Sequence, residues 1–198
     1  MRSFVFGLTL GIAIGPIALL ILNFALTRGF IVGAACAIGS SGADFIYALL
    51  AFGAGHVLAP WLEAHHVLFG AIAGVALLAI GARVLIDGVR DVRGRKVEAA
   101  AAHKEQNPVL TTFVLTLVNP MTIIGFAAFG AQLDLTGSWL AVVGNAFAAV
   151  CGTGVVSVGI AGAGGALAPL LRQTNAIGWL NVVSGAAIAA FGVAGLVG

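Results

Sequence analysis

The sequence contains long apolar runs that carry almost no charge, and this feature excludes most ways in which a chain of 198 residues can fold. About 20 consecutive apolar residues suffice to cross a lipid bilayer as a helix. Six runs reach that length, at about residues 3–26, 30–55, 66–87, 108–131, 137–164 and 173–197. They lack the alternating pattern that is typical of a barrel strand. We therefore predict an all-α integral membrane protein with six transmembrane helices.

The composition agrees with this class and leaves little room for a soluble domain. Hydrophobic residues make up 61% of the chain and charged residues 8%, and the mean hydropathy is +1.13. Ordinary globular proteins carry about 25% charged residues, and a soluble core of this length would expose many of these apolar side chains. The sequence has no nucleotide-binding loop and no basic nucleic-acid patch. We expect no enzymatic activity, no cofactor and no nucleic-acid partner.

Two prolines interrupt apolar runs that otherwise favour helix. Gly15-Pro16 lies within the first run, and Asn119-Pro120 lies within the fourth. Proline donates no backbone hydrogen bond and collides with the carbonyl group four residues earlier, which for Pro120 belongs to Thr116. In hydrocarbon, a freed carbonyl group must find a protein partner, a water molecule or a bound solute. We therefore predict a kinked or opened helix at both prolines, and each break is a candidate binding site.

A shift of the sequence by 104 residues superposes Pro16 on Pro120 and indicates an internal repeat. The match includes glycines spaced seven residues apart, which are Gly74, Gly81 and Gly88 in the first half and Gly178, Gly185 and Gly192 in the second. Glycine at such spacing is typical of surfaces where two membrane helices pack closely. Each half holds three runs, so the second half would enter the membrane from the opposite face. We predict two inverted three-helix repeats.

The predicted domain organisation follows from this repeat and from the distribution of charge. Residues 1–198 form a single transmembrane domain, with repeats at 1–87 and 108–198 and a hydrophilic linker at 88–107. Six spans place eight Lys and Arg residues on the linker side and only Arg2 on the other side. Because cytoplasmic loops carry the excess of basic residues, we predict a cytoplasmic linker and both termini outside.

Asp44 is the only acidic residue deep inside a predicted span. An acid at the centre of a membrane helix costs about 2.5–3.5 kcal/mol on insertion scales, and such residues usually serve a function. Offsets of three and four residues place Ser40, Ser41, Asp44 and Tyr47 in one polar stripe on the second helix. At 1.5 Å per residue, Asp44 lies about 21 Å from the cytoplasmic end of its helix and Asn119 about 17 Å. The acid and the second break should therefore lie at nearly one depth.

Two interpretations of Asp44 stay open. It either binds a substrate ammonium group or a proton during transport, or it stabilises helix packing as a protonated hydrogen-bond donor. Cys36 and Cys151 also leave open a membrane thiol redox relay, although isolated apolar cysteines usually behave as small hydrophobic residues. A divalent-cation or other ion exporter is a further alternative. One central acid supplies too few ligands for a metal unless two subunits share it, so we predict no metal site.

Several motifs together resemble the lysine exporter family of small transporters. They are Gly11-x3-Gly15-Pro16, Gly42-Ala43-Asp44-Phe45-Ile46-Tyr47, Asn119-Pro120-Met121-Thr122-Ile123, and Asn181-x2-Ser184-Gly185 with Phe191-Gly192. The resemblance covers essentially the whole chain. It implies a secondary transporter of the bacterial inner (plasma) membrane that exports amino acids or related small metabolites from the cytoplasm, driven by a proton or ion gradient. It also implies a six-helix inverted repeat and a homodimer.

These observations combine into a prediction of alternating access around a small site where the broken first and fourth helices meet. The predicted substrate-binding or coupling residues are Asp44, Ser40, Ser41, Tyr47, Gly15, Pro16, Asn119, Pro120 and Thr122. In this hypothesis, half-helix N-termini face a substrate carboxylate, freed carbonyl groups face an amine or water, and Asp44 supplies the single negative charge.

Overall fold

The computed structural model describes residues 1–12, 15–93, 107–130, 132–133, 138–171 and 176–197, and its regular elements are helices. They are α1 (Arg2–Ile12), α2 (Pro16–Arg28), α3 (Phe30–Val92), α5 (Pro108–Leu117), α6 (Pro120–Gly130), α7 (Trp139–Leu171) and α8 (Ala176–Val197). Large apolar side chains lie on the outside, and Ile31 and Leu140 are 81% and 83% exposed. A surface of this kind suits contact with lipid acyl chains rather than with water.

Four helical segments are long and apolar enough to span a membrane. They are Phe30–Gly53, Gly70–Val92, Trp139–Leu170 and Gly178–Leu196. The pair α1 and α2 and the pair α5 and α6 each meet the same test when the pair is taken as one bent span. The described part of the chain therefore offers up to six spans, in agreement with the six runs of the sequence.

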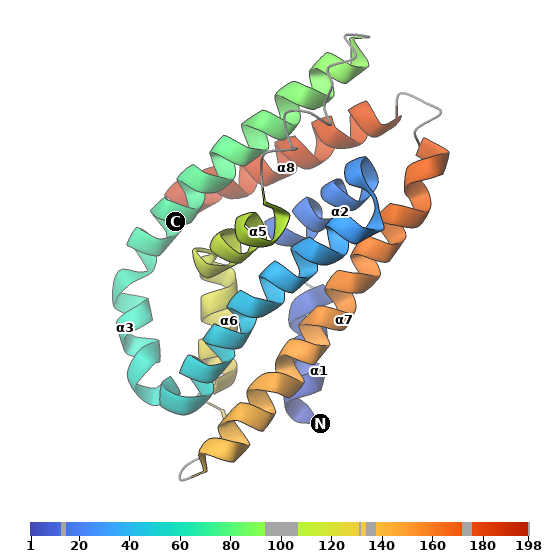
Figure 1. Ribbon diagram of the computed structural model, residues 1–198. Coiled ribbons are helices and arrows are strands. Elements are labelled where there is room, and N and C mark those ends of the chain that lie inside the picture. Colours follow the sequence, from blue (N-terminus) through green and yellow to red (C-terminus); the bar gives the residue numbers. More distant parts are fainter. Residues whose placement is uncertain (13–14, 94–106, 131, 134–137, 172–175, 198) are drawn as a thin grey trace.

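Helix α3 differs from the prediction because it contains both the second and the third predicted spans. It continues for 63 residues, and it curves back on itself at the end of the molecule where the N-terminus lies (Figure 1). The predicted break between residues 55 and 66 was therefore wrong. Between Gly55 and Gly70 the only strong helix breaker is Pro60, and proline can bend a helix without ending it. At its other end α3 continues past the predicted end of the span to Val92, and residues 94–106 of the predicted linker lie outside the described residues.

Both predicted breaks are present. Helices α1 and α2 meet at 70°, and α5 and α6 meet at 58°. Pro16 and Pro120 each begin the second helix of a pair, where a missing N–H costs no helical hydrogen bond. Of the three partners expected for the freed Thr116 carbonyl group, the structure supplies a protein donor, because this group accepts a hydrogen bond from the Asn119 N–H at 3.1 Å. A tight turn of the backbone thus replaces the missing donor.

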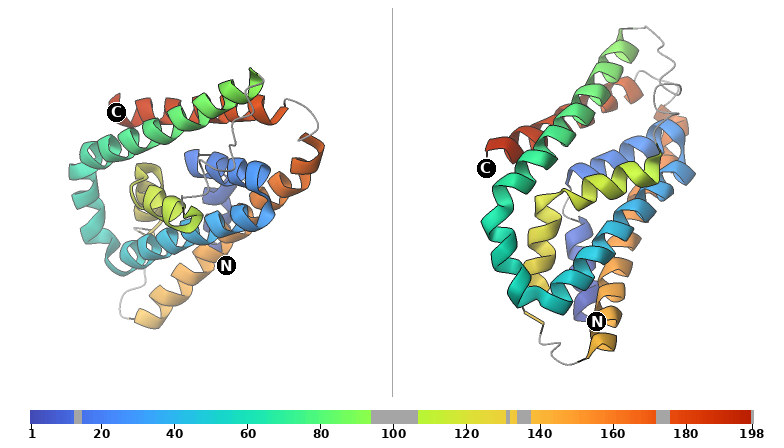
Figure 2. Two further views of the ribbon diagram at one scale, coloured as in Figure 1. Left: turned by 45° about the horizontal axis from the view of Figure 1, so that its top comes forward. Right: turned by 60° about the vertical axis from the view of Figure 1, so that its left-hand side comes forward.

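The second half of α3 packs against α8 along the predicted glycine ladder, and the two helices lie side by side in Figures 1 and 2. A Cβ atom at Gly74 would lie 2.7 Å from the Gly192 carbonyl oxygen, and one at Gly88 would lie 2.8 Å from the Gly178 carbonyl oxygen. A larger side chain at these positions would force the two backbones apart. The prediction that these glycines form a packing surface is confirmed.

The first helix of each bent pair also packs on a long helix through glycine. Helix α1 lies on α7 where Gly7 faces the backbone of Ala149, and α5 lies on the first half of α3 where Gly39 faces the backbone of Val109. Helices α2, α5 and α6 occupy the interior, inside the bend of α3 (Figure 2). Gly29 alone joins α2 to α3, with a φ of 96° that glycine adopts without strain.

Two hydrophobic clusters form much of the core. The phenylalanine cluster consists of Phe6, Phe52, Phe126 and Phe129, whose contacting ring centroids are 4.0–6.2 Å apart. The isoleucine cluster consists of Ile17, Leu20, Ile21, Phe24, Ala25, Cys36, Leu77, Leu115, Ala161 and Ile188. The phenylalanine cluster includes α1 and α6, whereas α2 supplies much of the isoleucine cluster. The two helix breaks therefore lie between the clusters.

Candidate functional site

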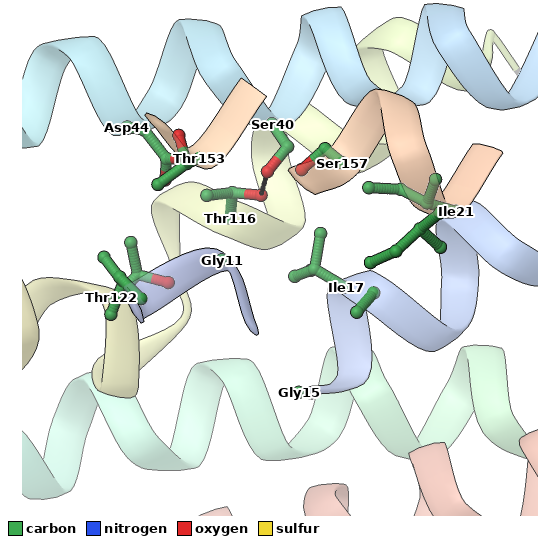
Figure 3. A pocket seen from close by; sticks show the side chains of 13 residues that line it. Gly11, Gly15, Ile17, Ile21, Ser40, Asp44, Thr116, Thr122, Thr153 and Ser157 are labelled. Atoms are coloured by element: carbon green, nitrogen blue, oxygen red, sulfur yellow. Dashed lines mark hydrogen bonds between the residues drawn. The ribbon is translucent and has the colours of Figure 1, made fainter. Parts of the chain in front are cut away.

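A cavity of about 70 Å³ lies where the two bent pairs meet (Figure 3). Its lining comes from both sides of both breaks and from two long helices. The lining residues are Leu10, Gly11, Gly15, Ile17, Ala18, Ile21, Ser40, Asp44, Thr116, Thr122, Thr153, Ser157 and Ile160. The fold thus brings both helix breaks and the intramembrane acid to one small space.

The cavity lies between the two core clusters. Along α3, Cys36 belongs to the isoleucine cluster, Asp44 lines the cavity, and Phe52 belongs to the phenylalanine cluster. Along α7 the same order is given by Ala161, Thr153 and Ala149, since Ala149 packs with the phenylalanine cluster. The polar cavity therefore lies between two apolar clusters along both long helices.

Among the described residues that line the cavity, only Asp44 has an ionisable side chain, and it is 6% exposed. Thr153 of α7 lies beside it, with its hydroxyl group placed to donate to the carboxylate (Figure 3). The same hydroxyl group lies 3.2 Å from the Val150 carbonyl oxygen, and it has one proton to give. A carboxylate has about four acceptor sites, so Asp44 retains capacity for a cationic or donating solute.

Hydroxyl groups make up the rest of the polar wall. Ser40, Thr116, Thr122, Thr153 and Ser157 all line the cavity. Thr116 donates to the Ser40 hydroxyl oxygen at 3.2 Å, which links α5 to α3 (Figure 3). Because a hydroxyl group both donates and accepts hydrogen bonds, this wall can replace part of the hydration shell of a small solute.

Four of the nine predicted site residues line the cavity, namely Gly15, Ser40, Asp44 and Thr122. The other five are within three residues of a lining residue in the sequence, and Pro16, Ser41, Tyr47 and Asn119 are not among the described residues that line the cavity. Pro16 and Pro120 begin the second helices of the breaks, and the carbonyl oxygen of Asn119 accepts from the Ile123 N–H at 3.3 Å in the first turn of α6. These three residues shape the breaks.

Ser41 and Tyr47 lie apart from the cavity for geometric reasons. Ser41 is turned about 100° around α3 from Ser40, and it packs toward Gly154 of α7. Tyr47 shares the face of Ser40 but lies about 10 Å further along the helix. There its hydroxyl group donates to the Leu117 carbonyl oxygen, just before the second break. Tyr47 thus gives a hydrogen-bond donor to the carbonyl group of the last residue of α5.

Three hydroxyl residues of the cavity were not predicted from the sequence, and they are Thr116, Thr153 and Ser157. A signal for them was present. Thr153 and Ser157 are four residues apart, so they share one face of α7, and Thr116 has the same spacing from Thr112. Paired hydroxyl groups at helical spacing inside an apolar run indicate a polar helix face, as the structure shows for both pairs.

Other intramembrane polar residues join helices outside the cavity. The Asn23 side-chain amide donates to the Asn181 side-chain oxygen at 2.6 Å and to the Ser184 hydroxyl oxygen at 3.3 Å, which links α2 to α8. The Ser3 hydroxyl group donates to the Asn145 side-chain oxygen at 2.6 Å and links α1 to α7. These bonds hold the bent pair α1 and α2 at its two far ends.

The geometry does not favour the redox relay. Cys36 and Cys151 are both free thiols. The first half of α3 runs antiparallel to α7 (Figure 1), and Gly33 packs against Ala161. Cys36 therefore lies opposite a position some seven residues from Cys151, about 10 Å along the helix, whereas disulfide-bonded Cα atoms lie about 4.4–6.8 Å apart. Within the part of the chain that the structure describes, no group of three or more His, Cys, Asp or Glu residues is placed to hold a metal ion.

An apolar exterior, up to six spans and a polar cavity at two helix breaks define a multi-pass membrane protein with room for a small solute. The particular family follows from comparison with known proteins. Residues 8–197 match the family model of the LysE type translocator, and the chain therefore belongs to the LysE type translocator family. The match confirms the predicted resemblance. The family consists of membrane exporters, in agreement with the prediction that the protein is not an enzyme. Comparisons with curated proteins and with solved structures gave no match.

Proposed function

We propose that this protein is a secondary transporter that exports amino acids or related small metabolites from the cytoplasm by proton-coupled alternating access. The observation that carries the proposal is the position of Asp44 in a cavity bordered by both helix breaks. Such a cavity offers a negative charge, hydroxyl groups and broken helix ends within reach of one small molecule. Membership of a translocator family supports the direction and the type of transport.

The two charged groups of an amino acid have complementary partners in this site. The substrate ammonium group would bind the Asp44 carboxylate. Gly15 lines the cavity and directly precedes α2, a helix of 13 residues. The N-terminus of a helix carries partial positive charge and unpaired N–H groups, so the substrate carboxylate would lie there. The zwitterion would thus be bound by one acidic side chain and one helix N-terminus, without a basic side chain of the protein.

Asp44 would couple export to the proton gradient because it can hold a proton or the substrate ammonium group, but not both. Exchange of one for the other on opposite sides of the membrane links the two movements. Thr153 supports the exchange, since its hydroxyl group can donate to the charged carboxylate or to the Val150 carbonyl oxygen when Asp44 is protonated. The shift by 104 residues places Ala148 at the position equivalent to Asp44, so only one half would carry the coupling group.

The reciprocal packing of the two halves supports alternating access. Helix α1 of the first half packs on α7 of the second, and α5 of the second half packs on α3 of the first. In Figure 1 the pair α1 and α2 and the pair α5 and α6 run in opposite directions. This is the arrangement expected of two inverted repeats, residues 1–87 and 108–198. Movement of the pair α1 and α2 against the other helices would open the isoleucine cluster and the phenylalanine cluster in turn, and the isoleucine cluster would face the cytoplasmic linker.

Replacement of Asp44 tests this proposal. In proteoliposomes with an imposed pH gradient, Asp44→Asn should reduce amino-acid transport to background, while the protein stays folded in the membrane. Asp87→Asn is the matched control, because Asp87 is also on α3 and is 7% exposed, but it does not line the cavity. Unchanged gradient-driven transport by Asp44→Asn would contradict the coupling role. Transport of divalent cations in place of amino acids would favour the ion-exporter alternative.

A further inference from the structure

We propose that the cavity selects small amino acids with a neutral aliphatic side chain, and that Ile17, Ile21 and Ile160 determine this specificity. The inference rests on the proposed export of amino acids and goes further by naming the substrate class. It follows from three properties of the cavity, namely the separation of its polar and apolar walls, its charge and its size.

One group of polar lining residues and one group of isoleucines lie on different sides of the cavity. Asp44, Ser40 and Ser157 come from α3 and α7 and lie along one side in Figure 3, whereas Ile17 and Ile21 of α2 lie along another. Ile160 packs against the isoleucine cluster that contains Ile17 and Ile21, and it extends this apolar wall. A ligand with its ammonium group at Asp44 would therefore place its side chain against branched aliphatic groups, which favour apolar surface over polar groups.

The charge of the cavity limits the ligand to one ammonium group. Within the part of the lining that the structure describes, Asp44 is the only acid, and no residue is Lys, Arg or His. A second ammonium group would lie against the isoleucines without a partner, and a second carboxylate would be repelled by Asp44. Burial of an unpaired charge costs far more than burial of a methyl group stabilises. Basic and acidic side chains should both be rejected.

The volume of the cavity favours a short side chain. A water molecule needs a cavity volume of about 10–15 Å³. A cavity of about 70 Å³ therefore has room for roughly five to seven groups of the size of a water molecule. This is close to the size of a small amino acid. An aromatic or long unbranched side chain would have to displace Ile17, Ile21 or Ile160.

A pair of isosteric ligands tests the charge argument with the unmodified protein. Norvaline and 2,4-diaminobutyrate have the same chain length and differ by a methyl group in place of an ammonium group. In proteoliposomes we expect norvaline to be transported at least about tenfold faster. Equal rates would overturn the proposed specificity and leave amino-acid export intact. Failure of every amino acid in the panel, with alanine and lysine included, would overturn the proposed function itself.

Shortening one isoleucine tests the role of the aliphatic wall. Ile21→Ala should raise the rate for leucine or phenylalanine relative to alanine by about tenfold, because the space of three side-chain carbon atoms is gained. Ile188→Ala is the matched control, since both isoleucines are 1% exposed and belong to the isoleucine cluster, but Ile188 does not line the cavity. An unchanged ratio in Ile21→Ala, or an equal shift in Ile188→Ala, would contradict the assignment. Ile160→Ala provides a second test from α7 if Ile21→Ala is poorly folded.

Discussion

The two helix breaks are held in different ways, although both begin with proline. At the break between α5 and α6, hydroxyl groups tie α5 to α3 along its length. Thr112 donates to the Cys36 carbonyl oxygen at 2.8 Å, and Thr116 donates to Ser40 at 3.2 Å. Tyr47 adds a third bond from α3, to the last residue of α5. This half-helix is therefore fixed to the helix that carries Asp44.

Among the described residues of α1 and α2, Ser3 and Asn23 form interhelical side-chain hydrogen bonds, and both lie away from the break. Ser3 lies near the start of α1, and Asn23 lies in the second half of α2. Between them, the pair packs on its neighbours through Gly7, Leu10 and Ile17. Packing against small and apolar groups permits sliding more readily than a row of buried hydrogen bonds, whose rupture leaves unpaired groups. We expect α1 and α2 to move during transport while α5 moves with α3.

Valine substitutions at the packing glycines should have the largest effect, because they separate each half-helix from its support. Gly7→Val and Gly39→Val place side-chain atoms against the backbones of Ala149 and Val109. We expect each to lower the free energy of unfolding by at least about 3 kcal/mol, measured by thermal unfolding of the detergent-solubilised protein. Gly144→Val is the control, since a Cβ there meets no atom within 4 Å. Equal stability of the Gly39 and Gly144 variants would contradict the packing.

Removal of one hydroxyl group from each bent pair should distinguish α5, which is fixed to α3, from the pair α1 and α2, which we expect to move. Tyr47→Phe leaves the Leu117 carbonyl group without its donor, which costs about 1–3 kcal/mol, and it loosens the break beside the cavity. Ser3→Ala removes a buried hydroxyl group from α1 far from the cavity. We expect similar losses of thermal stability in both variants and a severalfold loss of transport rate in Tyr47→Phe alone. Equal transport by the two variants would remove the distinction between the breaks.

Replacement of both cysteines should have the smallest effect. Neither thiol lines the cavity, so Cys36→Ala combined with Cys151→Ala should transport within about twofold of the unmodified protein. Alanine at position 36 removes one buried sulfur atom and should lower stability by only about 1 kcal/mol. A loss of transport much larger than this change in stability would restore the redox relay as an explanation.

The breaks and the glycine ladder could be predicted from the sequence because their causes are local. Proline lacks an N–H whatever surrounds it, and a seven-residue spacing of glycine is visible before any helix is placed. The continuity of α3 was not predictable in the same way. Pro60 can bend a helix or end one, and the outcome depends on packing that the sequence does not display.

The composition of the cavity shows a similar limit. Asp44 stood out because an acid in an apolar run is rare. Ile17 and Ile21 did not, because isoleucine in a membrane span is equally expected against lipid, in a core or beside a solute. Ser40 and Ser41 were equivalent candidates until the packing of α7 decided which one faces the cavity, and that contact joins residues more than 100 positions apart.

The most direct test of the account asks whether the space between the two breaks is the transport site. A single thiol introduced by Ser40→Cys in the cysteine-free double variant would be exposed to a membrane-impermeant methanethiosulfonate reagent during transport, with Ser41→Cys as the neighbouring control. We predict that modification at position 40 stops transport, that a transported amino acid slows this modification, and that position 41 shows no such protection. Modification at position 40 without loss of transport, or without protection by any transported solute, would contradict a substrate site at this cavity.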